Sequence, residues 1–166
     1  MKNILLIIAI VFTMSAEAQS TASGKMEDLK PMVGTWEGDG WFMDETRKRT
    51  EFTQKEDVSL EIGGNALLIK GKGFNGDDIV HDAMAIISFD SSVEKYDVFS
   101  VLADGKRTHA ELRVLASGKF EWGFDVQGGF VKYSISIEND LWVEKGAFSP
   151  DKENWYPFIS FTLNRI

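Results

Sequence analysis

The chain has 166 residues, a formal net charge of −8 and no cysteine. This length suits one domain, with a core large enough to stand without disulfide bonds. The lack of cysteine excludes thiolate metal sites and cysteine catalysis. An acidic chain without a basic cluster also argues against nucleic acids and anionic membranes as partners.

The first residues have the pattern of an export signal. Lys2 supplies a positive charge, Ile4 to Met14 form an uncharged apolar run, and Ala16-Glu17-Ala18 offers a cleavage site. An apolar run needs about 20 residues to span a bilayer, and this one is shorter. We therefore expect a signal peptide over residues 1–18, with a membrane anchor or an ordinary first helix as the alternatives. No cysteine follows for lipidation, so the mature protein is expected to be secreted or periplasmic, without a membrane span.

Residues 19–31 are expected to be a flexible leader that ends in a short helical plug. Met26 to Lys30 can form one helical turn, which Pro31 is expected to stop. A frayed N-terminus is the alternative reading of the same residues.

From Thr35 to the end of the chain, apolar runs alternate with turn signals such as Gly63-Gly64-Asn65 and Asp104-Gly105, and no long helical pattern intervenes. Spaced strands of this kind indicate an all-β sandwich or barrel. Short turns throughout favour a single up-and-down antiparallel β-barrel of about ten strands, since closure removes exposed sheet edges. The expected strands are residues 36–43, 50–62, 66–74, 80–89, 95–102, 107–115, 119–127, 131–137, 141–148 and 155–165.

The first strand carries a family resemblance. Gly34-Thr35-Trp36 resembles the Gly-x-Trp start of the calycin superfamily, which includes lipocalins and fatty-acid-binding proteins. The run from Gly34 to Gly40 is most similar to bacterial lipocalin-like families of unknown function. The resemblance implies a lipocalin-like barrel over residues 32–166. It also implies that Arg165 packs across the indole of Trp36 to close the barrel, the alternative being a solvated C-terminal arginine.

Aromatic residues on the later strands are candidates for a ligand-binding wall. In a barrel of this size, inward side chains either fill the interior or surround one small ligand. Strand phase alone does not distinguish these two cases, and it leaves open which face of residues 141–148 points inward. The candidate ligand-binding residues with inward phase are Phe120, Trp122, Phe124, Tyr133 and Phe161.

Three more specific chemistries are weakly supported by the sequence. Fatty-acid-binding proteins hold the carboxylate with an arginine and a tyrosine near the C-terminus, but only Ile166 follows Arg165. Nitrobindins bind heme through a histidine on a late strand, and no histidine follows His109. His81 has acidic neighbours but fits no metal motif. We therefore expect no cofactor and no metal. Arg113 and His109 share a face that is expected to be solvated.

The sequence favours an exported binding or carrier protein for a small, mainly hydrophobic ligand, as a monomer or weak homodimer. One alternative is a barrel enzyme such as an isomerase or cyclase, which requires a buried titratable group beside the cavity; Glu37 with Glu144 is a conceivable pair. No hydrolase elbow or phosphate loop is present, so an enzyme is not the favoured reading. Another alternative is a plugged barrel that binds partners through exposed Trp41, Trp142 and Trp155.

Overall fold

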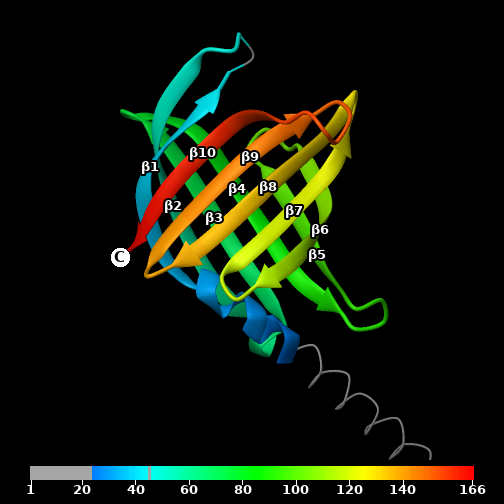
Figure 1. Cartoon of the computed structure of the whole chain (residues 1–166). Helices are drawn as coiled ribbons and strands as arrows, with labels where there is room; N and C mark the ends of the chain where they lie inside the picture. Colours follow the sequence, from blue (N-terminus) through cyan, green and yellow to red (C-terminus); the bar gives the residue numbers. More distant parts are fainter. Residues whose placement is uncertain (1–23, 45) are drawn as a thin grey trace, which may run out of the picture.

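The computed structural model describes residues 24–44 and 46–166, so the signal peptide expected over residues 1–18 lies outside it. Ten antiparallel strands close into one barrel, and each strand pairs with its neighbours in the chain (Figure 1). β1 also pairs with β10, which closes the barrel. The strands are β1 (Gly34–Met43), β2 (Arg49–Glu61), β3 (Ala66–Asn75), β4 (Asp78–Asp90), β5 (Lys95–Leu102), β6 (Arg107–Ala116), β7 (Lys119–Val126), β8 (Gly129–Glu138), β9 (Leu141–Ser149) and β10 (Tyr156–Arg165).

The predicted all-β up-and-down barrel is confirmed, and the ends of every expected strand agree with the structure to within two residues. Continuous pairing from β1 round to β10 rules out the two-layer sandwich. A short 3-10 turn, η2 (Ile62–Gly64), joins β2 to β3. No helix among the described residues is long and apolar enough to cross a membrane.

The seam between β1 and β10 depends on close backbone approach. Gly40 pairs with Phe161, and a Cβ at Gly40 would lie only 2.9 Å from the Phe161 Cα atom. The absence of a side chain at Gly40 therefore lets β10 turn Phe161 into the barrel beside it.

A short 3-10 helix, η1 (Glu27–Met32), covers one end of the barrel (Figure 1). Its Leu29 and Met32 side chains are fully buried in the core, which matches a plug. The Trp36 indole Nε1 donates to the Met32 carbonyl at 2.9 Å, so β1 also holds the helix in place. The expectation that Pro31 stops the helix was wrong, because Pro31 lies inside η1 and the helix ends at Met32. A proline with its fixed φ fits a helical turn wherever its missing N–H is not needed.

Candidate functional site

An internal cavity of about 220 Å³ lies inside the barrel, and side chains from every strand except β1 line it, together with Met32 of η1. Most of its wall is apolar. The aliphatic part comes mainly from β3, β4, β5 and β8, and includes Ile69, Ala83, Ala85, Ile87, Val98, Leu102 and Ile135.

Aromatic rings form the wall of the cavity on β7 and β8. The rings of Trp122 and Tyr133 are stacked, with centroids 4.2 Å apart and planes within 6°. The Phe124 ring also stacks on Trp122, with ring centroids 5.9 Å apart. Of the five residues predicted to bind ligand, Trp122, Phe124, Tyr133 and Phe161 line the cavity. Phe120 does not line it; its side chain is 1% exposed and belongs to the packed core.

Polar side chains gather on the cavity wall where β2 and β9 contribute to it. Gln54, Glu56 and Glu144 are 1%, 7% and 8% exposed, respectively. The Gln54 amide Nε2 donates to Glu56 Oε1 at 2.7 Å, and the Trp142 indole donates to Glu144 Oε2 at 3.2 Å. Two oxygens, Gln54 Oε1 and Glu56 Oε2, are buried without a hydrogen-bond partner. Buried polar atoms usually have partners, so two orphaned acceptors on a cavity wall indicate a place for a ligand's donors.

Glycines on β3 make room for these polar side chains. A Cβ at Gly71 would lie 2.7 and 2.8 Å from the two Glu56 carboxylate oxygens. A Cβ at Gly73 would lie 2.8 Å from Gln54 Oε1. Gly71-Lys72-Gly73, which has no phosphate-loop spacing, therefore has a packing role: the two glycines leave the space that Gln54 and Glu56 occupy.

Burial disfavours ionisation of the Glu56 and Glu144 carboxyl groups. Desolvation raises the pKa of Glu56 from an ordinary 4.5 to about 7, although the hydrogen bond from Gln54 lowers it. Desolvation, together with the nearby charge of Glu56, raises the pKa of Glu144 to about 8, although hydrogen bonds from Trp142 and Trp122 oppose the shift. At neutral pH the pair therefore holds protons that exposed carboxylates would have lost.

Two further titratable groups line the cavity. Burial lowers the pKa of His81, which keeps its imidazole neutral, while Asp82 partly opposes this. Desolvation and the charge of Glu144 raise the pKa of Tyr133, so its phenol stays protonated. Asp82 itself pairs with Lys72 at 3.3 Å on the outer face, and no group of metal-ligating side chains occurs among the described residues.

The structure changes the sequence-based view of the acidic residues. Glu37 lies on the outer face, where it pairs with Lys55 at 3.0 Å, so the conceivable Glu37–Glu144 pair does not form. The charge that Glu144 faces is that of Glu56. Gln54 and Glu56 were missed, although they alternate in phase with the inward Phe52 and Val58. A polar residue within an apolar alternation was the signal that could have identified them.

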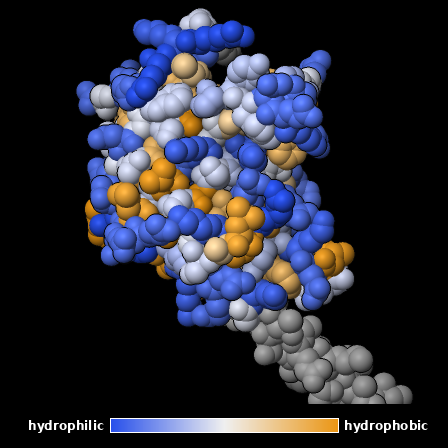
Figure 2. All heavy atoms as spheres, viewed as in Figure 1, coloured by the Kyte–Doolittle hydropathy of each residue, from blue (hydrophilic) through white to orange (hydrophobic). Residues whose placement is uncertain are grey.

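The inward face of β9, left open by the sequence, is the one that carries Trp142 and Glu144. Trp142 is 2% exposed, so its suggested role in a surface patch was wrong. Trp41 and Trp155 lie under cations, with Arg49 4.7 Å and Lys132 4.1 Å from their ring centroids. Figure 2 shows a face on which hydrophilic side chains separate the apolar ones.

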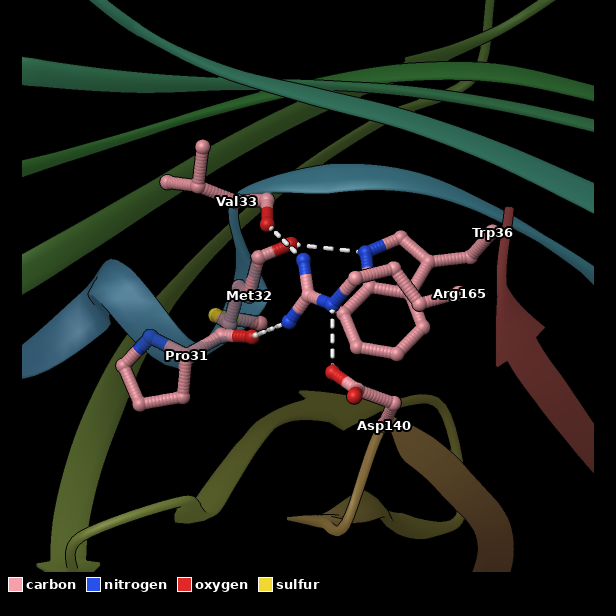
Figure 3. Close-up of polar contacts among 6 residues, drawn as sticks. All are labelled: Pro31, Met32, Val33, Trp36, Asp140 and Arg165. Atoms are coloured by element: carbon pink, nitrogen blue, oxygen red, sulfur yellow. Dashed lines mark hydrogen bonds and ion pairs between the residues drawn. The ribbon is translucent and has the colours of Figure 1, made fainter.

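At the plugged end, Arg165 lies across Trp36, as the family resemblance implied (Figure 3). The guanidinium carbon is 3.9 Å from the ring centroid. Its nitrogens donate to the carbonyls of Val33 and Pro31, and Nε donates to Asp140 at 2.8 Å. This cluster joins β10 to η1, β1 and the turn before β9.

Solved structures of other proteins have a similar barrel architecture. Rv2717c from M. tuberculosis aligns with a TM-score of 0.63 at 12% identity, over 85% of this chain and 96% of that one. The S-type phycobiliprotein lyase CPES from Guillardia theta aligns with a TM-score of 0.60 at 11% identity, over 84% and 91% of the two chains. The chain has a lipocalin-like, calycin-type barrel fold.

A third structure with this calycin-like fold is a protein of unknown function from the DUF3598 family of Nostoc punctiforme. It aligns with a TM-score of 0.52 at 13% identity over 85% of this chain, which spans about half of that protein (49%). No protein-family model and no curated protein matches the sequence. At these low sequence identities, the similarity to the three solved structures shows only a shared fold.

Proposed function

We propose that this protein binds and carries a small, mainly hydrophobic molecule inside its barrel. The observation that carries the proposal is the internal cavity of about 220 Å³ with its apolar and aromatic wall. A dry apolar cavity of about 150 Å³ is enough for benzene, and drug-sized ligands occupy about 300–1,000 Å³. The cavity therefore suits a molecule of one or two rings.

The carrier is proposed to act outside the cytoplasm, as a secreted or periplasmic protein and as a monomer or weak homodimer. Support comes from the N-terminal sequence, in which a basic residue, an apolar run and Ala16-Glu17-Ala18 follow in the order of a cleavable signal. N-terminal sequencing of the protein from its own host tests this; a mature chain beginning near Gln19 is the expected result.

Binding is tested by native mass spectrometry of the protein from its host, followed by extraction of any passenger. A stoichiometric small molecule is the expected result. Ala85→Leu places extra volume in the cavity and should reduce occupancy at least tenfold. Met84→Leu, the next residue on β4 but 44% exposed on the outer face, is the matched control. A bare mass, with no binding of indole or naphthalene to the purified protein, would contradict the proposal.

A barrel enzyme is the second candidate, and the buried pair of Glu56 and Glu144 is the observation that favours it. Carboxyl groups with pKa values near 7 and 8 suit proton transfer at neutral pH. CPES, which has a barrel of this shape, is itself named a lyase. If the wild type converts the extracted passenger to another compound and Glu144→Gln does not, the protein is an enzyme; a passenger recovered unchanged from both supports the carrier.

A further inference from the structure

The charges on the cavity wall restrict the kind of ligand it can hold. Of the described residues that line it, Glu56 and Glu144 are acidic, and none is lysine or arginine. An anionic head group would therefore meet carboxyl groups and no fixed positive charge, which is unfavourable at low dielectric. A cation would meet two carboxyl groups that can ionise beside it.

The two cavity oxygens without a hydrogen-bond partner also favour a ligand with a positively charged donor group over an anionic ligand. Gln54 Oε1 is an acceptor, Glu56 Oε2 is an acceptor once the carboxyl group is ionised, and both atoms belong to side chains that are more than nine-tenths buried. Gln54 is fixed in orientation because its Nε2 already donates to Glu56 Oε1. A ligand nitrogen that carries several hydrogens can donate to both atoms, whereas an ether, ketone or carboxylate cannot.

An aromatic wall lies beside this polar site. Glu144 contacts the Trp142 indole, and its charge acts on Tyr133, whose ring stacks on Trp122 at 4.2 Å. Ring faces attract both cations and other rings. One small molecule can thus place its nitrogen at the carboxyl groups and its ring against Trp122 and Tyr133.

We propose that the cavity binds a small aromatic amine in its protonated form. The ammonium group donates to Gln54 Oε1 and Glu56 Oε2, Glu144 adds negative charge, and the ring lies against Trp122 and Tyr133. This inference rests on the proposed binding function and gives its ligand a chemical class.

Binding of the cation is coupled to proton release. The empty site holds protons on Glu56 and Glu144 at neutral pH, and a bound ammonium group favours the ionised carboxylates. The other titratable groups on the wall are His81 from β4 and Tyr133 from β8; burial keeps His81 neutral, and Tyr133 stays protonated below pH 10. Affinity for the amine should therefore rise as the pH increases from 6 to 8.5.

Three probes of similar size separate charge from shape: 2-phenylethylamine, 2-phenylethanol and 3-phenylpropanoate. Calorimetry on the purified mature protein at pH 8 should give at least about tenfold tighter binding for the amine than for the alcohol, and the weakest binding for the acid. At pH 7, repeating the amine titration in buffers of different ionisation enthalpy should show net proton release; the alcohol should show none.

Glu56→Gln and Glu144→Gln keep the shape of the site and remove one charge each. Each should bring the amine-to-alcohol affinity ratio several-fold closer to one. Glu51→Gln is the control, because Glu51 lies on β2 like Glu56 but is exposed and paired with Arg49. It should leave the amine-to-alcohol affinity ratio unchanged.

The outcomes distinguish this inference from the proposed function. An alcohol that binds as tightly as the amine overturns the amine inference and leaves an apolar carrier. Tightest binding by the acid also overturns it. Failure of all three probes overturns it too, while the passenger analysis and Ala85→Leu decide the binding function separately.

Discussion

Trp36 and Arg165 are register partners across the seam between β1 and β10, and the Arg165 guanidinium carbon lies 3.9 Å from the centroid of the Trp36 indole. The two residues lie near opposite ends of the described chain. They meet only because the sheet closes. The guanidinium also binds the carbonyls of Pro31 and Val33, so one side chain connects the end of the chain to the plug.

Arg165→Lys should destabilise the fold by about 1–3 kcal/mol, because lysine keeps the charge but loses the planar group that stacks and donates to several acceptors. Urea unfolding measures the change. Arg113→Lys is the control: Arg113 pairs with Glu121 on the outer face and should change stability by less than about 0.5 kcal/mol. Equal effects of the two substitutions would mean that the cluster does not hold the barrel closed.

Gly71→Ala should displace the Glu56 carboxyl group and destabilise the protein by about 1–3 kcal/mol, because the added methyl group would lie 2.7 Å from a carboxylate oxygen. The double variant Gly71→Ala with Glu56→Ala should recover part of this loss, since the clash is then removed. Thermal unfolding of the wild type, the single variants Gly71→Ala and Glu56→Ala, and the double variant measures the coupling. Lys72→Ala, whose exposed side chain lies on the opposite face of β3, serves as the control. Additive effects at Gly71 and Glu56 would contradict the steric account.

The fold was readable from the sequence because it depends on local signals. Alternation of apolar residues and frequent turn signals indicate the strands, whereas the Arg165–Trp36 contact that closes the barrel was implied by the resemblance to calycins. The polar site was not readable in the same way. Gln54 and Glu56 were hidden because polar residues on a strand are usually solvated, and their burial depends on space left by Gly71 and Gly73 on the next strand.

The same limit applies to the aromatic residues. Phase placed Phe120 and Trp122 on the same inward face, but phase does not report height along the barrel axis. Phe120 lies nearer the beginning of β7, where the core is packed, whereas Trp122 lies farther along the strand and reaches the cavity. Which inward residues meet empty space depends on the volume of side chains from all the other strands.

The raised pKa values of Glu56 and Glu144 predict that stability falls as the pH rises. In the unfolded chain both groups lose their protons near pH 4.5, but in the folded protein they do so near 7 and 8. The folded state therefore binds more protons between these values, so the free energy of unfolding decreases as the pH increases from about 5 to above 8. For two groups the decrease is on the order of a few kcal/mol. His81 acts in the opposite direction, because its lowered pKa costs stability as the pH falls below 6.5.

Urea unfolding between pH 7.5 and pH 9, where His81 is almost entirely neutral in both the folded and the unfolded state, isolates the carboxyl pair. Glu144→Gln should be more stable than the wild type at pH 9 by at least about 1 kcal/mol, because a neutral amide replaces a buried charge. Its stability should also vary less with pH. Glu138→Gln, at an exposed position at the end of β8, should follow the wild type. If the free energy of unfolding of Glu144→Gln varied with pH in parallel with that of the wild type, the pKa of Glu144 would not be raised in the folded protein.

Trp122 should report ligand binding through its fluorescence. Only Trp122 and Trp142 of the five tryptophans line the cavity, and Trp142 is packed at 5.5 Å against Trp36 with its Nε1 donating to Glu144. A ring that enters the cavity therefore changes the surroundings of Trp122 most. Trp122→Phe should remove most of the fluorescence change on titration with indole-free aromatic probes such as 2-phenylethylamine or naphthalene. Trp155→Phe, on the outer surface beneath Lys132, should retain the change.

Calorimetry on both variants separates loss of signal from loss of binding, since phenylalanine keeps an aromatic wall and should weaken affinity by less than about tenfold. A fluorescence change that persists in Trp122→Phe and disappears in Trp155→Phe would place the ligand outside the barrel.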